Sequence, residues 1–229
     1  MKKNQLVTLK IERMAGLQEG IGFVEQKPVH VKGALLGQIV EVRISRNRND
    51  YAEGKLLSVI EASGMETESF CGHYGICGGC SMQTLPYPAQ LEMKRDWIYG
   101  LLKSHLPEDL FNNLEFAGVL PSPRQLTYRN KMEFTFGNAY KGGETNLGLH
   151  KKGQFGAVIT TDQCQICDSD FTTLLTAVLE FFRERGVDHY SKFSHEGILR
   201  HLVIRKGEKT GEILVALSAA KPSAEILSG

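Results

Sequence analysis

The sequence predicts an α+β protein that is mostly β. We expect a five-stranded barrel in residues 1–62, a cysteine-rich loop with a following helix in residues 63–105, and a β-rich central α+β domain with one long amphipathic helix in residues 106–229. Three observations support this prediction: glycine-punctuated alternation near the start, three cysteines within ten residues, and one complete helical stripe late in the chain. The 229 residues, 41% of them hydrophobic, are ordinary for a globular protein, and no apolar run is long enough to cross a membrane.

Short runs of alternating apolar and polar residues, separated by glycines, fill the first sixty positions. Five strands are expected: Leu6–Ile11, Ile21–Val24, Val29–Val31, Ile39–Ile44 and Tyr51–Ile60. Five strands in so short a segment predict a small closed barrel, because closure removes the exposed sheet edges. The five-stranded oligonucleotide-binding barrel is the obvious candidate for this architecture.

Positive charge gathers in two parts of the chain. Residues 1–60 hold ten Lys and Arg against six Asp and Glu, and residues 121–160 hold six against two, whereas residues 61–120 hold three against eight. A basic face is the minimum electrostatic feature of a nucleic-acid-binding surface, although a solvated surface explains such residues equally well. The candidate RNA contacts are Arg43, Arg46 and Arg48 in the barrel and Arg129 and Lys131 in the central domain.

The five cysteines fall in two places. Cys71, Cys77 and Cys80 lie among glycines in one ten-residue segment, and Cys164 and Cys167 lie together much later. Three close thiols and one distant thiol are the ligand inventory of a four-thiolate metal site. Glycine suits a loop that wraps a metal centre, because it lets the backbone approach closely.

Three other uses of these cysteines have to be weighed. Buried free cysteines are common, but chance rarely places three of five within ten residues. Disulfide bonds are disfavoured, because the number is odd and no apolar leader precedes the first strand, which indicates a reducing compartment. Zinc fits the two C-x2-C pairs, Cys77/Cys80 and Cys164/Cys167, with Cys71 unused. The full spacing favours a four-iron, four-sulfur cluster over zinc without excluding zinc.

Two segments have helical spacing. Residues 86–103 carry a partial apolar stripe, in which Trp97 is interpreted as a core or interface aromatic. The second helix is expected to begin after the N-cap residue Asp168 and to end at Gly186. Its apolar stripe, interpreted as core, consists of Phe171, Leu174, Leu175, Val178, Leu179 and Phe182.

Alternation predicts strands in the remainder of the central domain. Residues 131–136 place polar and apolar side chains on opposite faces, and residues 198–206 and 212–218 are expected to form a hairpin. His195 and His201 lie near these strands, and we interpret both as structural histidines.

Several motifs follow one another in an informative order. Val29–Gly37 and Tyr51–Lys55 resemble the TRAM domain, an RNA-binding barrel. The succession of Cys71–Cys80, Tyr128–Phe134 and Leu199–Arg205 is similar to that of bacterial RNA (uracil-C5)-methyltransferases of the 23S ribosomal RNA type. The resemblance covers nearly the whole chain, and the cysteine block is its most specific part.

This resemblance implies a cofactor and a ligand set. A four-iron, four-sulfur cluster would be bound by Cys71, Cys77, Cys80 and Cys164, with Cys167 outside the set. Its role would be structural. The parent enzyme would be cytoplasmic and would transfer a methyl group from S-adenosylmethionine to C5 of a uridine, most readily in ribosomal RNA.

The resemblance also implies that RNA recognition and catalysis lie in different domains. In the family, the cysteine nucleophile, the carboxylate base and the S-adenosylmethionine site lie in a C-terminal domain. We therefore expect this chain to be the RNA-recognising N-terminal part, with no catalytic or S-adenosylmethionine-binding residue and no activity by itself. No membrane or protein partner is implied. The alternative is a stand-alone zinc-dependent RNA-binding module without catalysis.

Overall fold

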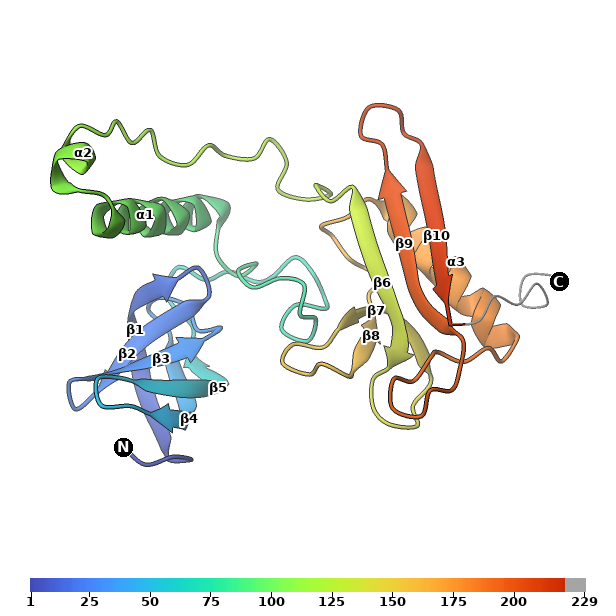
Figure 1. Ribbon diagram of the computed structural model, residues 1–229, viewed down its shortest axis with the longest axis horizontal. Helices are drawn as coiled ribbons and strands as arrows, with labels where there is room; N and C mark the ends of the chain where they lie inside the picture. Colours follow the sequence, from blue (N-terminus) through green and yellow to red (C-terminus); the bar gives the residue numbers. More distant parts are fainter. Residues whose placement is uncertain (221–229) are drawn as a thin grey trace. The chain divides into compact units, whose positions relative to one another are not determined.

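The computed structural model describes residues 1–220 and forms two compact units (Figure 1). Unit 1 consists of Met1–Glu68 and Thr84–Pro121, and unit 2 consists of Ser69–Gln83 and Ser122–Gly229. The cysteine-bearing segment therefore belongs to unit 2 and the helix that follows it to unit 1, so the expected segment 63–105 is shared between them.

Unit 1 begins with a closed five-stranded barrel. Its strands are β1 (Leu6–Gly16), β2 (Glu19–Val24), β3 (Lys27–Lys32), β4 (Ile39–Asn47) and β5 (Ala52–Glu61). They close in the order β1-β2-β3-β5-β4, with β3 and β5 parallel and the other pairs antiparallel. The interior is filled by completely buried aliphatic side chains such as Ile11, Val31 and Ile44. The predicted five-stranded barrel is confirmed.

The barrel interior leaves no room for a side chain at Gly54 in β5. A Cβ atom at this position would lie 2.1 Å from Cγ1 of Val42 and 3.3 Å from Cγ1 of Val29. Both valines are completely buried. Because a β-branched side chain is stiff at χ1, Val42 has no easy way to withdraw. Glycine at position 54 is therefore required by packing.

Two helices complete unit 1: α1 (Tyr87–His105) and α2 (Glu108–Asn112). All residues of α1 are described, and none of them is buried. Trp97 keeps 36% of its surface exposed, so it is not a core residue of this unit. Among residues 1–220, neither of these helices nor any other is long and apolar enough to cross a membrane.

Unit 2 is a five-stranded antiparallel sheet with a helix on one face (Figure 1). The strands are β6 (Lys131–Asn138), β7 (Thr145–His150), β8 (Val158–Thr160), β9 (Leu199–Lys206) and β10 (Ile213–Ala219), in the order β10-β9-β6-β7-β8. The helix is α3 (Ser169–Glu184), and its core residues pack against buried side chains of the sheet. The expected hairpin is formed by β9 and β10, with Lys206 opposite Ile213.

The ends of α3 are set by local chemistry. The Asp168 carboxylate accepts a hydrogen bond from the Asp170 N–H group at 3.0 Å, which satisfies one of the free donors of the first turn. Gly186 follows the last turn with φ +62°, a conformation that glycine adopts without strain. Between these ends, α3 buries Phe171, Leu175 and two further stripe residues. The helix therefore covers the sheet and begins just after the segment that carries the last two cysteines.

Candidate metal centre

The cysteine-bearing segment Ser69–Gln83 is a chain of turns fixed to the end of β7. The Gly78 N–H group donates to the His150 carbonyl at 2.9 Å, and the Lys152 N–H group donates to the Ile76 carbonyl at 2.8 Å. Within the segment, the Cys77 N–H group donates to the His73 carbonyl at 2.8 Å. These bonds hold the loop at one position beside β7.

Four cysteines from two distant parts of the chain line one pocket. Cys71, Cys77 and Cys80 come from the loop, and Cys164 comes from the segment between β8 and α3. The pocket contains about 320 Å³ that protein atoms do not fill, part of it open to solvent. Within residues 1–220, no three Cys, His, Asp or Glu side chains converge closely enough to hold one metal ion. The four thiols thus line one pocket without forming a ready-made site for a single ion.

The structure separates Cys167 from this group. Cys167 is 2% exposed and belongs to the hydrophobic core beneath α3. A hydrogen bond from its thiol lowers the pKa of Cys164 to about 6, against burial, which raises it. The same bond, reinforced by burial, raises the pKa of Cys167 itself. Cys164 is thus the cysteine best prepared to be a thiolate, and Cys167 remains a buried thiol.

The two cysteines at the end of the loop are partly desolvated. Burial raises the pKa of both Cys77 and Cys80, and the neighbouring thiolates raise it further. Two donors oppose this shift: the Gly79 N–H group, 3.3 Å from the Cys77 sulfur, and the Gln83 side chain at Cys80. Because a metal ligand has to be a thiolate, a bound cation would remove the main cost of deprotonating these side chains.

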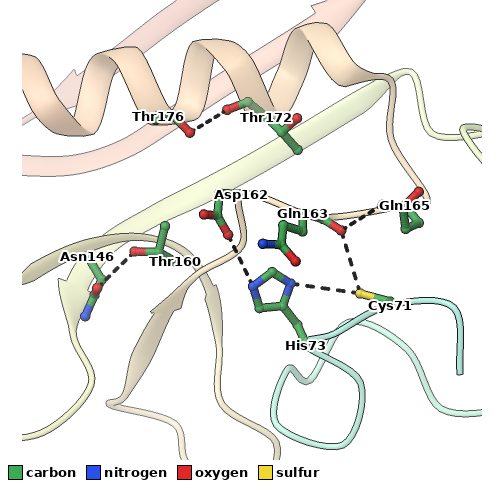
Figure 2. Close-up of polar contacts among 9 residues, drawn as sticks. All are labelled: Cys71, His73, Asn146, Thr160, Asp162, Gln163, Gln165, Thr172 and Thr176. Carbon is green, nitrogen blue, oxygen red and sulfur yellow. Dashed lines mark hydrogen bonds and ion pairs between the residues drawn. The ribbon is translucent and has the colours of Figure 1, made fainter.

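A histidine of the loop, His73, lies between Cys71 and Asp162. Figure 2 shows the His73 ring between Asp162 and Cys71. Its Nε2 atom lies 3.4 Å from the Asp162 carboxylate, and its Nδ1 atom lies 3.9 Å from the Cys71 sulfur. His73 was not among the site residues expected from the sequence. Its place two residues after a candidate ligand was the only available signal.

The chemistry of the pocket fits a sulfur-ligated metal centre. Four soft thiol donors select zinc or iron–sulfur clusters over hard cations. Two buried polar atoms of the lining, Gln83 Oε1 and Thr161 Oγ1, have no hydrogen-bond partner among the described residues. Native proteins seldom leave such atoms unpaired. The Thr161 hydroxyl can donate to a sulfur atom of a bound centre, whereas the Gln83 oxygen can only accept.

The candidate RNA contacts lie in both units. Arg43 is exposed in the middle of β4, and Arg46 and Arg48 are exposed at its end and just after it. Arg46 forms an ion pair with Glu53 at 3.8 Å. In unit 2, Lys131 is exposed at the start of β6 and pairs with Glu133 at 3.6 Å.

Arg129 stands apart from these exposed residues. It is half-buried, and its positive charge lowers the pKa of both Cys80 and Cys164. At Cys80 the larger effect is burial, which raises the pKa. At Cys164 the larger effect is the hydrogen bond from Cys167, which also lowers the pKa. The structure thus gives Arg129 a place beside the cysteines that its basic character alone does not indicate.

Comparisons with known proteins agree with this architecture. Residues 2–57 match the family model of the TRAM domain, which confirms the resemblance of the barrel. The chain is 45% identical to an uncharacterized RNA methyltransferase of Caldanaerobacter subterraneus over 94% of its own length and 47% of the relative. It is 43% identical to an uncharacterized RNA methyltransferase of Clostridium tetani over 95% of its own length and 47% of the relative. The chain therefore spans about half the length of these curated relatives.

A solved structure has the same fold. The crystal structure of Pyrococcus abyssi tRNA (uracil-54, C5)-methyltransferase in complex with S-adenosyl-L-homocysteine matches with a TM-score of 0.66 and 21% sequence identity. The match covers 94% of this chain and 46% of that chain. The shared fold thus extends through both units of this chain.

Proposed function

We propose that this chain is the RNA-recognising part of an S-adenosylmethionine-dependent RNA (uracil-C5)-methyltransferase. The observation that carries the proposal is the closed barrel, which matches the TRAM domain over residues 2–57 and exposes arginines at the end of β4. The similarity to RNA methyltransferases over 94% or more of the chain supports it, as does the fold shared with a tRNA (uracil-54, C5)-methyltransferase.

We assign the methyl-transfer chemistry to the half of the relatives that this chain does not span. C5 methylation requires a thiolate that adds to C6 of the uracil, after which C5 takes the methyl group as its bond to the sulfonium sulfur of S-adenosylmethionine breaks. A base then removes the C5 proton, and the C6–S bond breaks to release the thiolate. Among residues 1–220, four cysteines line the metal pocket and Cys167 is 2% exposed. We therefore assign none of these five cysteines the role of the nucleophile that attacks a flipped base.

We also propose that Cys71, Cys77, Cys80 and Cys164 bind a four-iron, four-sulfur cluster. The spacing of the thiols in the sequence favours a cluster over a single zinc ion, because Cys71, Cys77 and Cys80 lie close together and the fourth thiol, Cys164, is distant. When bound, the cluster supplies a structural link between the loop and Cys164, which are distant in the sequence.

Metal analysis tests the identity of this centre. Protein purified without oxygen should contain about four irons and four sulfides per chain, because four-thiolate clusters have this composition. One zinc per chain and no iron would overturn the cluster and support the alternative, a stand-alone zinc-dependent RNA-binding module. A metal-free protein that takes up neither iron with sulfide nor zinc would overturn both assignments.

RNA binding tests the function of the barrel. The chain should bind fragments of ribosomal RNA with an affinity that falls steeply with salt, because phosphate contacts release counterions. Replacing Arg46 and Arg48 together by Ala should reduce the salt slope by about one to two units. The matched control removes Arg95 and Lys103, two exposed cations of α1, and should leave the slope unchanged.

Two results would contradict this proposal in different ways. If no RNA binds at low salt, the chain is not an RNA-recognising part. If transfer RNA binds more tightly than ribosomal RNA of equal length, the recognition function stands but the ribosomal substrate is wrong. Transfer RNA is the appropriate competitor, because the Pyrococcus abyssi neighbour is a tRNA methyltransferase.

A further inference from the structure

Two phenylalanines of unit 2 are almost completely exposed. Phe155, in the loop between β7 and β8, is 85% exposed, and Phe193, between α3 and β9, is 94% exposed. The two loops are neighbours, because the Nζ atom of Lys192 lies 5.7 Å from the centre of the Phe155 ring. Exposed apolar residues scattered singly need no explanation, whereas two almost fully exposed phenylalanines on neighbouring loops do.

The ring of Phe155 is held in a defined orientation. The imidazole of His150 lies parallel to it, with an interplanar angle of 2° and a distance of 5.9 Å between ring centres. His150 is the last residue of β7, and the chain turns back at Lys151, whose N–H group donates to the Ala157 carbonyl at 2.9 Å. The loop that carries Phe155 is therefore closed at its base by the sheet.

Phe193 lies at the tip of a hydrogen-bonded turn. The hydroxyl of Ser191 accepts from the N–H groups of Phe193 and Ser194 at 3.3 and 3.2 Å, and the Ser191 N–H group donates to the Glu196 carbonyl at 2.8 Å. The turn ends at Gly197, where a Cβ atom would lie 2.0 Å from the His189 carbonyl oxygen. Phe193 thus lies in a turn that several hydrogen bonds fix, so its exposure is a property of the fold.

Basic residues outnumber acidic ones in the two segments that carry these rings. The segment 150–157 contains Lys151 and Lys152 and no acidic residue. The segment 189–200 contains Lys192 and Arg200 against one acidic residue, Glu196. The Arg200 guanidinium stacks on Tyr190 at 4.1 Å from the ring centre. The two segments therefore carry exposed aromatic rings and a net positive charge. Lys192 lies beside the Phe155 ring, whereas the Lys151 ammonium donates to the Ala139 carbonyl at 3.3 Å.

We propose that Phe155 and Phe193 form a stacking platform for unpaired bases of RNA, which we name the Phe155/Phe193 platform. This inference rests on the proposed RNA-binding function. Every base has a π face, so aromatic side chains bind single-stranded RNA with little sequence preference while adjacent Lys and Arg contact the phosphates. A protein partner suits this surface less well, because lysine is depleted in protein–protein interfaces.

Affinity for a single-stranded oligouridine probe tests the platform in the full chain. Phe155→Ala and Phe193→Ala should each weaken binding about tenfold, because stacking on one aromatic ring is worth about one order of magnitude. Their salt slopes should stay unchanged, because no phosphate contact is lost, whereas Lys151→Ala/Lys152→Ala should lower the slope. The matched control is Leu120→Ala, which removes a 92% exposed apolar side chain in unit 1 and should have no effect.

A second measurement distinguishes stacking from simple apolar contact. Phe193→Trp in a Trp97→Phe background places the sole tryptophan on the platform, since the chain has one Trp. Its fluorescence should be quenched by oligouridine and much less by a duplex RNA of equal length. Phe193→Leu should lose as much affinity as Phe193→Ala, because leucine has no π face.

The outcomes separate this inference from the function on which it rests. If the wild-type chain binds RNA and the alanine variants bind it equally well, the platform is wrong and the RNA-binding function stands. If Phe193→Leu keeps the wild-type affinity for oligouridine, the Phe193 ring does not stack on a base and the inference is overturned. If the wild-type chain binds no RNA, both proposals are wrong.

Discussion

The Nε2 atom of His73 lies 3.4 Å from Oδ1 of Asp162, although the two residues are far apart in the sequence (Figure 2). The other ring nitrogen lies 3.9 Å from the sulfur of Cys71. His73 thus joins a candidate ligand to the segment that leads to Cys164. In metal sites, such outer partners orient the ligands and are nearly as sensitive to mutation as the ligands themselves.

We predict that His73→Ala shortens the lifetime of the cluster in air. Without the ring, Cys71 loses the group that orients its thiolate, and oxygen and solvent gain access to the sulfur. Iron should be lost about tenfold faster than from the wild type, measured as the iron-to-protein ratio over time after exposure to air. His105→Ala, which removes an exposed histidine of α1 in unit 1, is the control. Equal lifetimes for all three proteins would show that His73 has no such role.

We predict that Cys164 and Cys167 behave differently on substitution. Cys164→Ser should abolish iron retention, because it removes one of the four thiols that line the pocket. Cys167→Ala should retain iron, because Cys167 belongs to the core beneath α3. Circular dichroism should show that both variants are folded. Loss of iron from Cys167→Ala alone would identify Cys167 as the ligand, and equal loss from both would indicate the arrangement with two C-x2-C pairs.

We predict that Gly54→Ala destabilises the barrel by about 1–3 kcal/mol, the usual cost of overpacking a core. The added methyl group would lie 2.1 Å from Cγ1 of Val42. Urea unfolding of the full chain, followed by the fluorescence of Trp97 in unit 1, measures this change. Gly100→Ala in α1 is the control, because a Cβ atom there would meet no described atom within 4 Å apart from its chain neighbours and the nearby helix backbone, and alanine favours a helix.

A double mutant makes the same prediction more specific. Val42→Ala removes the methyl group that the new side chain would meet, so the Gly54→Ala/Val42→Ala protein should lose less stability than the two single variants added together. Simple additivity would show that the barrel relaxes around Gly54 without involving Val42.

We predict that His189 makes unit 2 less stable in acid. Desolvation lowers its pKa from 6.5, although Asp188 opposes the shift, and its Nδ1 atom lies 3.2 Å from the Thr145 hydroxyl. Below pH 6.5 the unfolded chain therefore binds more protons at this site than the folded chain, so stability falls as the pH is lowered through this range. Well above pH 6.5 the histidine is neutral in both states, so its pH-dependent contribution vanishes.

Thermal unfolding at about pH 7.5 and about pH 5.5, on either side of the ordinary histidine pKa, tests this prediction. The melting temperature should fall less for His189→Asn than for the wild type, because asparagine keeps a polar atom near Thr145 without titrating. The other titrating groups, including the thiols, contribute equally to the fall in melting temperature of both proteins, so the comparison isolates the contribution of His189. An identical fall in both would mean that His189 gains no proton on unfolding in this range.

The sequence by itself determined the elements whose side chains repeat regularly. Alternation and glycine turns located the five strands of the barrel, because each strand must turn apolar residues inward. Asp168 and the apolar spacing after it located the start of α3, because capping and helical periodicity are local. Where the stripe was only partial, the sequence was less informative: Trp97 in α1 is 36% exposed and not core.

The tertiary structure decided the direction of side chains in irregular segments. Spacing treats Cys164 and Cys167 as an equivalent pair, yet one lines the pocket and the other enters the core, since the chain turns between them to begin α3. The approach of His73 to Asp162 and of Lys192 to Phe155 has the same origin. A loop has no periodicity, so the contacts of its side chains depend on where the sheet brings the chain back, and only the folded molecule contains that information.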